Sequence, residues 1–329
     1  MSQSKPKPFA RGLSEVQMAG LARAMELQRH WWRDLLYLWR PSGHETGDYG
    51  LRLAVRDGYL NFYRRGQSVA RVAFSKGGEP HLSVHAKYVV SDAERSLPNL
   101  RYARLKTTEI THAKSPSRNY DGIDSLKAWI KVVDAHFTKE GDEKSLVDQL
   151  LSVSENSGVI DLEMALPAWE ENKSAPRMDL VAIEGSADGL ELVFGEVKVV
   201  GDPRVRCSGQ NLTVKPEVIK QLSQYQAYLA KPAHREAISQ AYLNTAKTLV
   251  ELNKMAGTLR AAMPLGSAIV EASVSDHLAV PQHAILIVMS CGDFSETRWD
   301  LHRQVLKAEV DLRMVELGAP GPMNLGVLV

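Results

Sequence analysis

The sequence predicts an α/β fold in two units: an N-terminal helix with a small antiparallel β module, and a larger unit in which helices and strands alternate. The first observation is a run of short apolar segments between residues 49 and 89, separated by Asp-Gly, Arg-Gly and Gly-Gly pairs that mark hairpin turns. The second is the change after residue 121 to helical stripes and strand-sized apolar runs such as Ala284–Met289. A chain of 329 residues is also long enough for two cores.

The N-terminal unit opens with a helix. Ser14 followed three residues later by Gln17 forms a capping-box pattern, and we expect the helix to run to Leu38. The tryptophans near its end, Trp31 and Trp32, predict a buried or interface-forming face rather than a base-stacking platform. The strands that follow carry Arg, Lys, Tyr and His on their exposed side. A nucleic-acid platform uses this mixture, but any half-exposed sheet shows it as well.

Residues Leu97–Tyr120 predict a connection between the two units. They are rich in Pro, Ser, Lys and Arg and lack periodicity, which is typical of a linker or a long basic loop. We therefore divide the chain into an N-terminal module, residues 1–120, and a second domain, residues 121–329. For the module we expect a role in binding substrate or a partner, either another protein or a second copy of the chain.

Overall charge gives no reason to expect a nucleic-acid partner, because the net charge is only +1. Attraction to phosphates would have to come from local clusters of basic residues. One such cluster lies between Arg52 and Lys76 and another between Asn99 and Tyr120. Each either contacts phosphates or is a solvated face of strands and loops.

The second domain predicts helices and strands in alternation. We expect helices at Ile123–Phe137, Glu143–Val153, Val218–Leu229, His234–Met263 and Ser295–Ala308. We expect strands at Met178–Ile183, Leu190–Val200, Ala284–Met289 and Val310–Leu317.

Three ionisable residues interrupt the central pair of apolar runs. The segments Met178–Ile183 and Leu190–Val200 flank a Gly/Ser/Asp-rich turn and predict a β-hairpin. Asp179 lies in the first strand, and Glu196 and Lys198 lie in the second, where i and i+2 side chains share a face. Charged groups are unfavourable in such strands unless they are paired or hold a metal. Two carboxylates beside an ammonium are suited to a hard cation such as Mg²⁺ and to phosphodiester chemistry.

At these residues the chain resembles the PD-(D/E)XK nuclease superfamily. Asp179 followed by Glu196-Val197-Lys198 is similar to its acidic and lysine motif, and Gln221 followed by Tyr225 resembles the Q-x-x-x-Y helix of its RecB-like branch. Gln224 and Tyr228 have the same spacing, but Tyr225 shares the inward stripe of the helix, which favours the first pair. The likeness spans about residues 141–318, although two residues separate Pro176 from Asp179 where the family has an adjacent Pro-Asp pair.

The resemblance implies a restriction-endonuclease-like mixed central sheet flanked by helices, and a Mg²⁺-dependent deoxyribonuclease for which Mn²⁺ can substitute. RNA stays open as an alternative substrate to DNA. It implies that Asp179 and Glu196 bind the metal with the backbone carbonyl of Val197, and that Lys198 assists the attacking water. It implies further that Gln221 and Tyr225 fix the site and contact the substrate.

Further contributors are expected from neighbouring segments. A helix before the first strand often supplies another acidic group in this family, and Glu143 fits that position; Glu163, in an apolar run, is the alternative. The loop after Lys198 should lie close to the site, so we expect its cations to bind nucleic acid. These cations are Arg204, Arg206 and Lys215.

Composition limits the remaining choices. No apolar run approaches the ~20 residues of a membrane-spanning helix, and the N-terminus lacks the apolar core of a secretory signal. Two cysteines without metal-type spacing predict a reducing, cytoplasmic location. Two alternatives to a nuclease stay open: a non-catalytic nucleic-acid-binding or scaffold protein with the same fold, and an enzyme acting on another phosphate ester.

Overall fold

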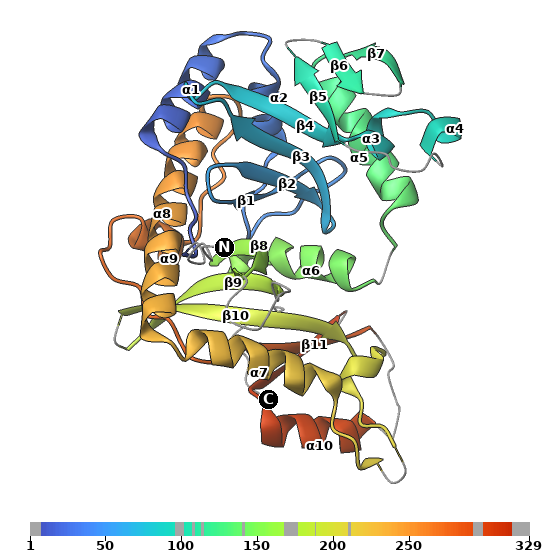
Figure 1. The fold of residues 1–329 in the computed structure, drawn as a ribbon, viewed down its shortest axis with the longest axis vertical. Helices are drawn as coiled ribbons and strands as arrows, with labels where there is room; N and C mark the ends of the chain where they lie inside the picture. The colour runs from blue at the N-terminus through green and yellow to red at the C-terminus, as the bar shows by residue number, and fades with distance from the viewer. Residues whose placement is uncertain are drawn as a thin grey trace, which may run out of the picture.

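Two β-sheets with helices around them make up the computed structural model, which describes residues 8–95, 102–106, 109–112, 115–139, 142–167, 177–187, 189–209, 212–291 and 299–317. The first sheet is antiparallel, with its seven strands in chain order from β1 to β7. The second is mixed, with five strands in the order β12-β11-β10-β9-β8. Figure 1 shows the antiparallel sheet at the top, the mixed sheet below it and α6 between them. The mixed α/β architecture is therefore confirmed.

The N-terminal helical region is divided in two. Helix α1 spans Glu15–Glu26 and α2 spans Trp31–Leu38, so the prediction of one helix up to Leu38 is wrong. The predicted capping box at Ser14 and Gln17 is confirmed. Leu27 is extended, and the His30 side chain caps α2 by accepting a hydrogen bond from the amide of Trp32 at 3.1 Å. This second cap starts a new helix whose tryptophans are buried, as the sequence predicts.

The antiparallel sheet is larger than the sequence indicates. Three of its strands fall within the segment 97–120, so the prediction of a linker or loop there is wrong. Ala103 and Leu105 of β5 are buried, whereas Tyr102 and Arg104 are exposed. This alternation is too short to predict a strand from the sequence, and β5 is ordered by its pairing with β4. The strands are β1 (Arg52–Val55), β2 (Leu60–Arg64), β3 (Gln67–Phe74), β4 (Pro80–His85), β5 (Tyr102–Lys106), β6 (Glu109–His112) and β7 (Ser115–Asn119). Two short helices, α3 (Ala86–Val89) and α4 (Asp92–Arg95), follow β4.

The elements expected after residue 121 are present, except that the first four residues of the helix expected at Ser295–Ala308 lie outside the described residues. The helices are α5 (Ile123–His136), α6 (Glu143–Ser152), α7 (Glu217–Leu229), α8 (Pro232–Gly257), α9 (Ser267–Ala272) and α10 (Trp299–Glu309). The strands are β8 (Val159–Ala165), β9 (Arg177–Ser186), β10 (Gly189–Val199), β11 (Ile285–Cys291) and β12 (Leu312–Leu317). Single 3₁₀ turns occur at Ser154–Asn156 and Pro203–Val205. The expected helix to Met263 is shorter, since α8 ends at Gly257.

Strand β10 is the centre of the mixed sheet. It pairs antiparallel with β9, which confirms the predicted hairpin, and parallel with β11 after the chain has passed through α7, α8 and α9. Gly195 lets the strands pack closely, because a Cβ there would lie 2.7 Å from a methyl carbon of Leu180 and 3.1 Å from one of Ile287. Figure 1 shows α6 on one side of this sheet and α7 on the other. Glu143 at the start of α6 contacts Lys198, and Gln221 near the start of α7 contacts Glu196, so both helices begin close to the end of β10 that carries Glu196 and Lys198.

Buried ion pairs account for half of the first basic cluster. Arg52 Nε lies 3.0 Å from Asp148 Oδ1 of α6, and Arg64 binds Asp134 of α5 at 2.8 Å. Arg56 pairs with Asp161 of β8. These three arginines are buried, so for them the expectation of phosphate contact or a solvated face is wrong. No described helix combines the length and apolar composition needed to cross a membrane.

Candidate functional site

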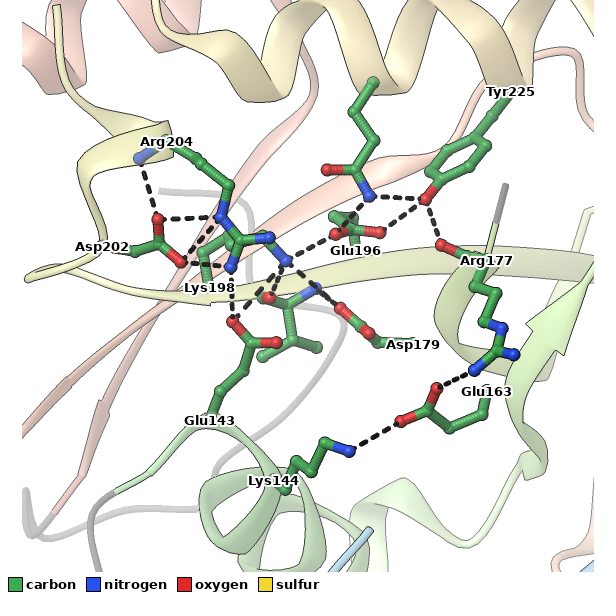
Figure 2. Close-up of polar contacts among 12 residues, drawn as sticks. Glu143, Lys144, Glu163, Arg177, Asp179, Glu196, Lys198, Asp202, Arg204 and Tyr225 are labelled. Carbon is green, nitrogen blue, oxygen red and sulfur yellow. Dashed lines mark hydrogen bonds and ion pairs between the residues drawn. The ribbon is translucent and has the colours of Figure 1, made fainter. Parts of the chain in front are cut away.

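The side chain of Lys198 lies at the centre of a group of carboxylates. Its Nζ is 2.5 Å from Glu196 Oε1, 3.5 Å from Asp179 Oδ2 and 3.6 Å from Glu143 Oε2. Figure 2 shows these groups converging from β9, β10 and the start of α6. We call Glu143, Asp179, Glu196 and Lys198 the acid–lysine cluster. The structure thus brings together the three hairpin residues singled out from the sequence.

Backbone geometry holds the two hairpin carboxylates next to each other. Gly195 pairs with Leu180 across the hairpin, so the following Glu196 lies beside Asp179. The backbone amide of Val197 donates to Asp179 Oδ2 at 2.7 Å, and its carbonyl accepts from Lys198 Nζ at 2.6 Å. Glu196 and Lys198 are almost completely buried, whereas Asp179 keeps 21% of its side chain exposed. The cluster is therefore open to solvent on the Asp179 side.

Helix α7 fixes the orientation of Glu196. Gln221 Nε2 donates to Glu196 Oε1 and contacts the Tyr225 hydroxyl, each at 2.7 Å. The Tyr225 hydroxyl lies 2.9 Å from Glu196 Oε2 and also reaches the backbone carbonyl of Arg177. Tyr228, the competing tyrosine, stacks on His234 instead, with ring centroids 4.0 Å apart. The structure therefore joins the preferred Gln-Tyr pair to the acid–lysine cluster.

The two candidate glutamates lie at different distances from the lysine. Glu143 contacts Lys198 directly and also lies 3.5 Å from Arg204. Glu163 of β8 is paired with Lys144 at 3.7 Å and with Arg177 at 3.8 Å, next to the cluster (Figure 2). Glu143 is therefore the better candidate for a further ligand.

The three loop cations have different partners. Arg204 joins the acid–lysine cluster through Glu143 and is held by Asp202 at 2.5 Å. Arg206 donates to the carbonyl of Val200 at 3.2 Å, and Lys215 pairs with Glu309 at 2.6 Å. Asp202 had no role in the sequence interpretation. Asp202 precedes a proline and lies two residues before Arg204, so it is suited to cap the short turn. This pattern is the sequence signal that could have indicated the role of Asp202.

Negative charge is in excess at this site. With Asp202 and Arg204 included, four carboxylates meet two cations, an excess of two negative charges when all are ionised. Burial and the charge of Asp179 raise the pKa of Glu196 to about 7. Burial also raises the pKa of Asp179 and of Glu143, against the opposing effect of Lys198. For Lys198, burial lowers the pKa, but Asp179 and Glu196 outweigh it and the net shift is upward.

The donor chemistry fits a hard divalent cation, since carboxylate and carbonyl oxygens are the ligands that Mg²⁺ prefers. A cation of charge two would also balance the excess of negative charge. As the side chains stand, the Lys198 ammonium occupies the space between the carboxylates. Among the residues that the structure describes, no group of three or more His, Cys, Asp or Glu side chains is spaced to hold a metal ion. Metal binding would thus require the lysine to withdraw from its short contact with Glu196.

Comparison of this chain with models of known protein families, with curated proteins and with solved structures gave no match.

Proposed function

We propose that this protein is a metal-dependent nuclease of the PD-(D/E)XK type that hydrolyses phosphodiester bonds, with DNA as the preferred substrate. The observation that supports this proposal is the acid–lysine cluster itself. Carboxylates from two hairpin strands and one helix surround a single buried lysine and leave an excess of negative charge beside an opening. A site of this kind costs folding free energy, so a cluster kept only for stability would be expected to have matched charges.

Asp179 and Glu196 would hold Mg²⁺, or Mn²⁺ in its place, together with the carbonyl of Val197 and with Glu143. A bound metal of this type polarises a phosphoryl oxygen and lowers the pKa of its water. Gln221 and Tyr225 act through Glu196: their hydrogen bonds fix both carboxylate oxygens, so that the ligand is oriented before the metal arrives.

Lys198 would supply a positive charge beside the metal once it has withdrawn from its short contact with Glu196. Since its pKa is raised, the side chain stays protonated at neutral pH in this arrangement. It can therefore donate to a phosphate oxygen or orient a water, and it can stabilise the charge that develops during cleavage. Removal of a proton from the attacking water is a less suitable role for a lysine held by two carboxylates.

A cleavage assay with Lys198→Ala tests the proposal. We expect wild type to cut single-stranded or duplex DNA in Mg²⁺ and to be inactive in a chelator. We expect Lys198→Ala to lose about 10²–10³-fold in rate, the cost of removing one preorganised donor. Lys220→Ala is the matched control, because Lys220 is an exposed residue of α7 outside the cluster. If folded Lys198→Ala cleaved DNA as fast as wild type, the assignment of Lys198 to the catalytic site would be wrong.

Asp179→Asn provides a second test if loss of the buried lysine prevents folding. It removes a proposed ligand but preserves an acceptor for the Val197 amide, and we expect no metal-stimulated cleavage. Nucleic-acid binding without cleavage by wild type in Mg²⁺ and Mn²⁺ would instead favour a non-catalytic binding or scaffold protein. Hydrolysis confined to small phosphate esters would favour the third alternative.

A further inference from the structure

The antiparallel sheet has two faces of different character. Leu60, Phe62, Val72 and Leu82 are buried on one face, where α2 and α5 cover the sheet. In the part of the chain that the structure describes, helices do not cover the other face in this way, and it carries polar and aromatic side chains. We call the following residues the polar face: Tyr59, Asn61, Arg71, His81, Ser83, His85, Tyr102 and Arg104.

The side chains of the polar face are arranged in a regular way. Asn61, Arg71, Ser83 and Arg104 pair in register across β2, β3, β4 and β5. The Arg71 guanidinium lies 3.9 Å from the centre of the Tyr59 ring. The Tyr102 ring contacts His85 edge-on, with centroids 5.3 Å apart, and 55% of Tyr102 is exposed. Exposed arginines and aromatic groups thus share this face of the sheet.

One edge of this surface lines a polar groove of about 410 Å³. Tyr59, Asn61 and Tyr102 line it on the side of the antiparallel sheet. Lys144 of α6, Glu163 of β8 and Arg177 of β9 line the opposite side, and Figure 2 shows these three in a row beside Asp179. The groove therefore lies between the two sheets.

The groove leads to the acid–lysine cluster. A smaller adjoining cavity is lined by Glu143 and Asp179, and it shares four lining residues with the groove. The shared residues are Tyr63, Gly66, Lys144 and Glu163. Gly66, in the turn between β2 and β3, lies against the Lys144 side chain, where a Cβ would come within 2.7 Å of it. The groove and the cavity beside the carboxylates therefore adjoin each other where Gly66 meets Lys144.

We propose that this groove binds a single-stranded nucleic acid and leads it to the acid–lysine cluster. Unpaired bases stack on exposed aromatic rings, and arginines beside them bind the backbone phosphates. Tyr102 supplies an exposed ring and Tyr59 a half-buried one. Arg71 and Arg104, which lie on the polar face outside the lining of the groove, supply positive charges next to it. The bases of a duplex are already stacked and paired, so this surface favours single strands. The cleavage step at the end of the groove rests on the proposed nuclease function, whereas the binding step does not.

Binding of a fluorescently labelled 12-nucleotide oligothymidylate, followed by anisotropy in a chelator so that no cleavage occurs, tests the groove. We expect wild type to bind the single strand more tightly than a duplex of equal length. Tyr102→Ala should weaken single-strand binding about 10-fold, since one base–aromatic stack contributes about 1–3 kcal/mol. Tyr37→Ala is the matched control: Tyr37 is 44% exposed but lies on α2, away from the polar face.

Equal affinities of Tyr102→Ala and Tyr37→Ala for the single strand, or tighter binding of wild type to the duplex, would overturn the proposal. The outcome is separable from that of the nuclease assay. Tyr102-dependent binding without any cleavage would support the groove and reject the nuclease. Cleavage of single strands by wild type, with binding and cleavage both unaffected in Tyr102→Ala, would reject the groove and leave the nuclease in place.

Discussion

Two buried charge clusters in this protein differ in how their charges are balanced. The first, which we call the interface cluster, consists of Arg11, Arg56, Asp161 and Tyr242. Asp161 of β8 is completely enclosed and is bound by Arg56 and by Arg11, the latter at 3.3 Å, while the Tyr242 hydroxyl donates to it at 3.0 Å. Every oxygen of this carboxylate has a partner, and the cluster joins the N-terminal unit to the mixed sheet.

The acid–lysine cluster has the opposite balance. Its carboxylates outnumber the cations, and one of them, Asp179, remains partly open to solvent. Burial without enough positive charge raises the pKa of Glu143, Asp179 and Glu196. In the interface cluster burial lowers the pKa of Arg56, but Asp161 together with Tyr63 and Tyr242 outweighs burial and the net shift is upward, so the charged form is the stable one. The comparison indicates that an enclosed carboxylate whose oxygens are all bound by arginines and a hydroxyl holds the fold, whereas carboxylates that outnumber the cations beside an opening are where a cation can bind.

The largest expected effect is on stability, at Asp161. Asp161→Asn leaves Arg11 and Arg56 buried without a counter-charge, and we expect the free energy of unfolding to fall by about 3–5 kcal/mol, measured by urea denaturation. Asp179→Asn is the matched variant in the other cluster. This substitution removes the ion pair with Lys198 but also relieves repulsion between carboxylates. We therefore expect the free energy of unfolding to change by about 1 kcal/mol or less. Equal losses in the two variants would contradict the distinction between the clusters.

The pH dependence of stability should show the surplus of negative charge directly. Because the pKa of Glu196 is raised to about 7 from its usual 4.5, the folded state binds this proton more tightly than the unfolded state does. Glu196 therefore contributes fully to the free energy of unfolding below about pH 4.5, and this contribution is lost as the pH rises to about 7. The loss is at most about 3 kcal/mol. The measurement is the unfolding free energy of metal-free protein against pH, with Glu196→Gln as reference. An identical profile in the two proteins would refute the argument.

Metal addition should reverse that loss. A ligand that binds only the folded state stabilises it by about 2.7 kcal/mol at one hundred times its dissociation constant. We expect Mg²⁺ or Mn²⁺ to raise the melting temperature of wild type above pH 7, where Glu196 is ionised, and to have no such effect on Glu196→Gln. Asp161→Asn should keep the metal response, because the interface cluster has no surplus carboxylate. A wild-type melting temperature independent of both metals would oppose metal binding at the acid–lysine cluster.

The parts of this structure that local pattern determines could be predicted from the sequence. The hairpin of β9 and β10, helix α7 and the meeting of Asp179 with Glu196 and Lys198 follow from turn residues and from periods of two and 3.6. The side of α7 that carries Gln221 and Tyr225 follows from the same helical period. Each of these features depends on residues close in the chain or paired across one turn.

Features that depend on distant partners could not be predicted in this way. Arg52 and Arg64 looked like members of a basic surface cluster, because nothing nearby in the sequence reveals that Asp148 and Asp134 lie against them. The strands between residues 102 and 119 are short and basic, and only their pairing with β4 and with one another orders them. The groove between the two sheets has the same origin, since its walls are far apart in sequence.

The smallest expected effect tests how α7 supports the acid–lysine cluster. Tyr225→Phe removes the hydroxyl beside Glu196 Oε2 while preserving the ring, which is completely buried. A hydrogen bond to a charged group contributes about 1.5–3 kcal/mol, so we expect cleavage to fall by about 10-fold or more at little cost in fold. Tyr228→Phe, one turn along the same helix and stacked on His234, should cleave like wild type. If the two variants lost activity equally, the hydroxyl of Tyr225 would have no specific role, and Glu196 would be oriented by Gln221 and Lys198 alone.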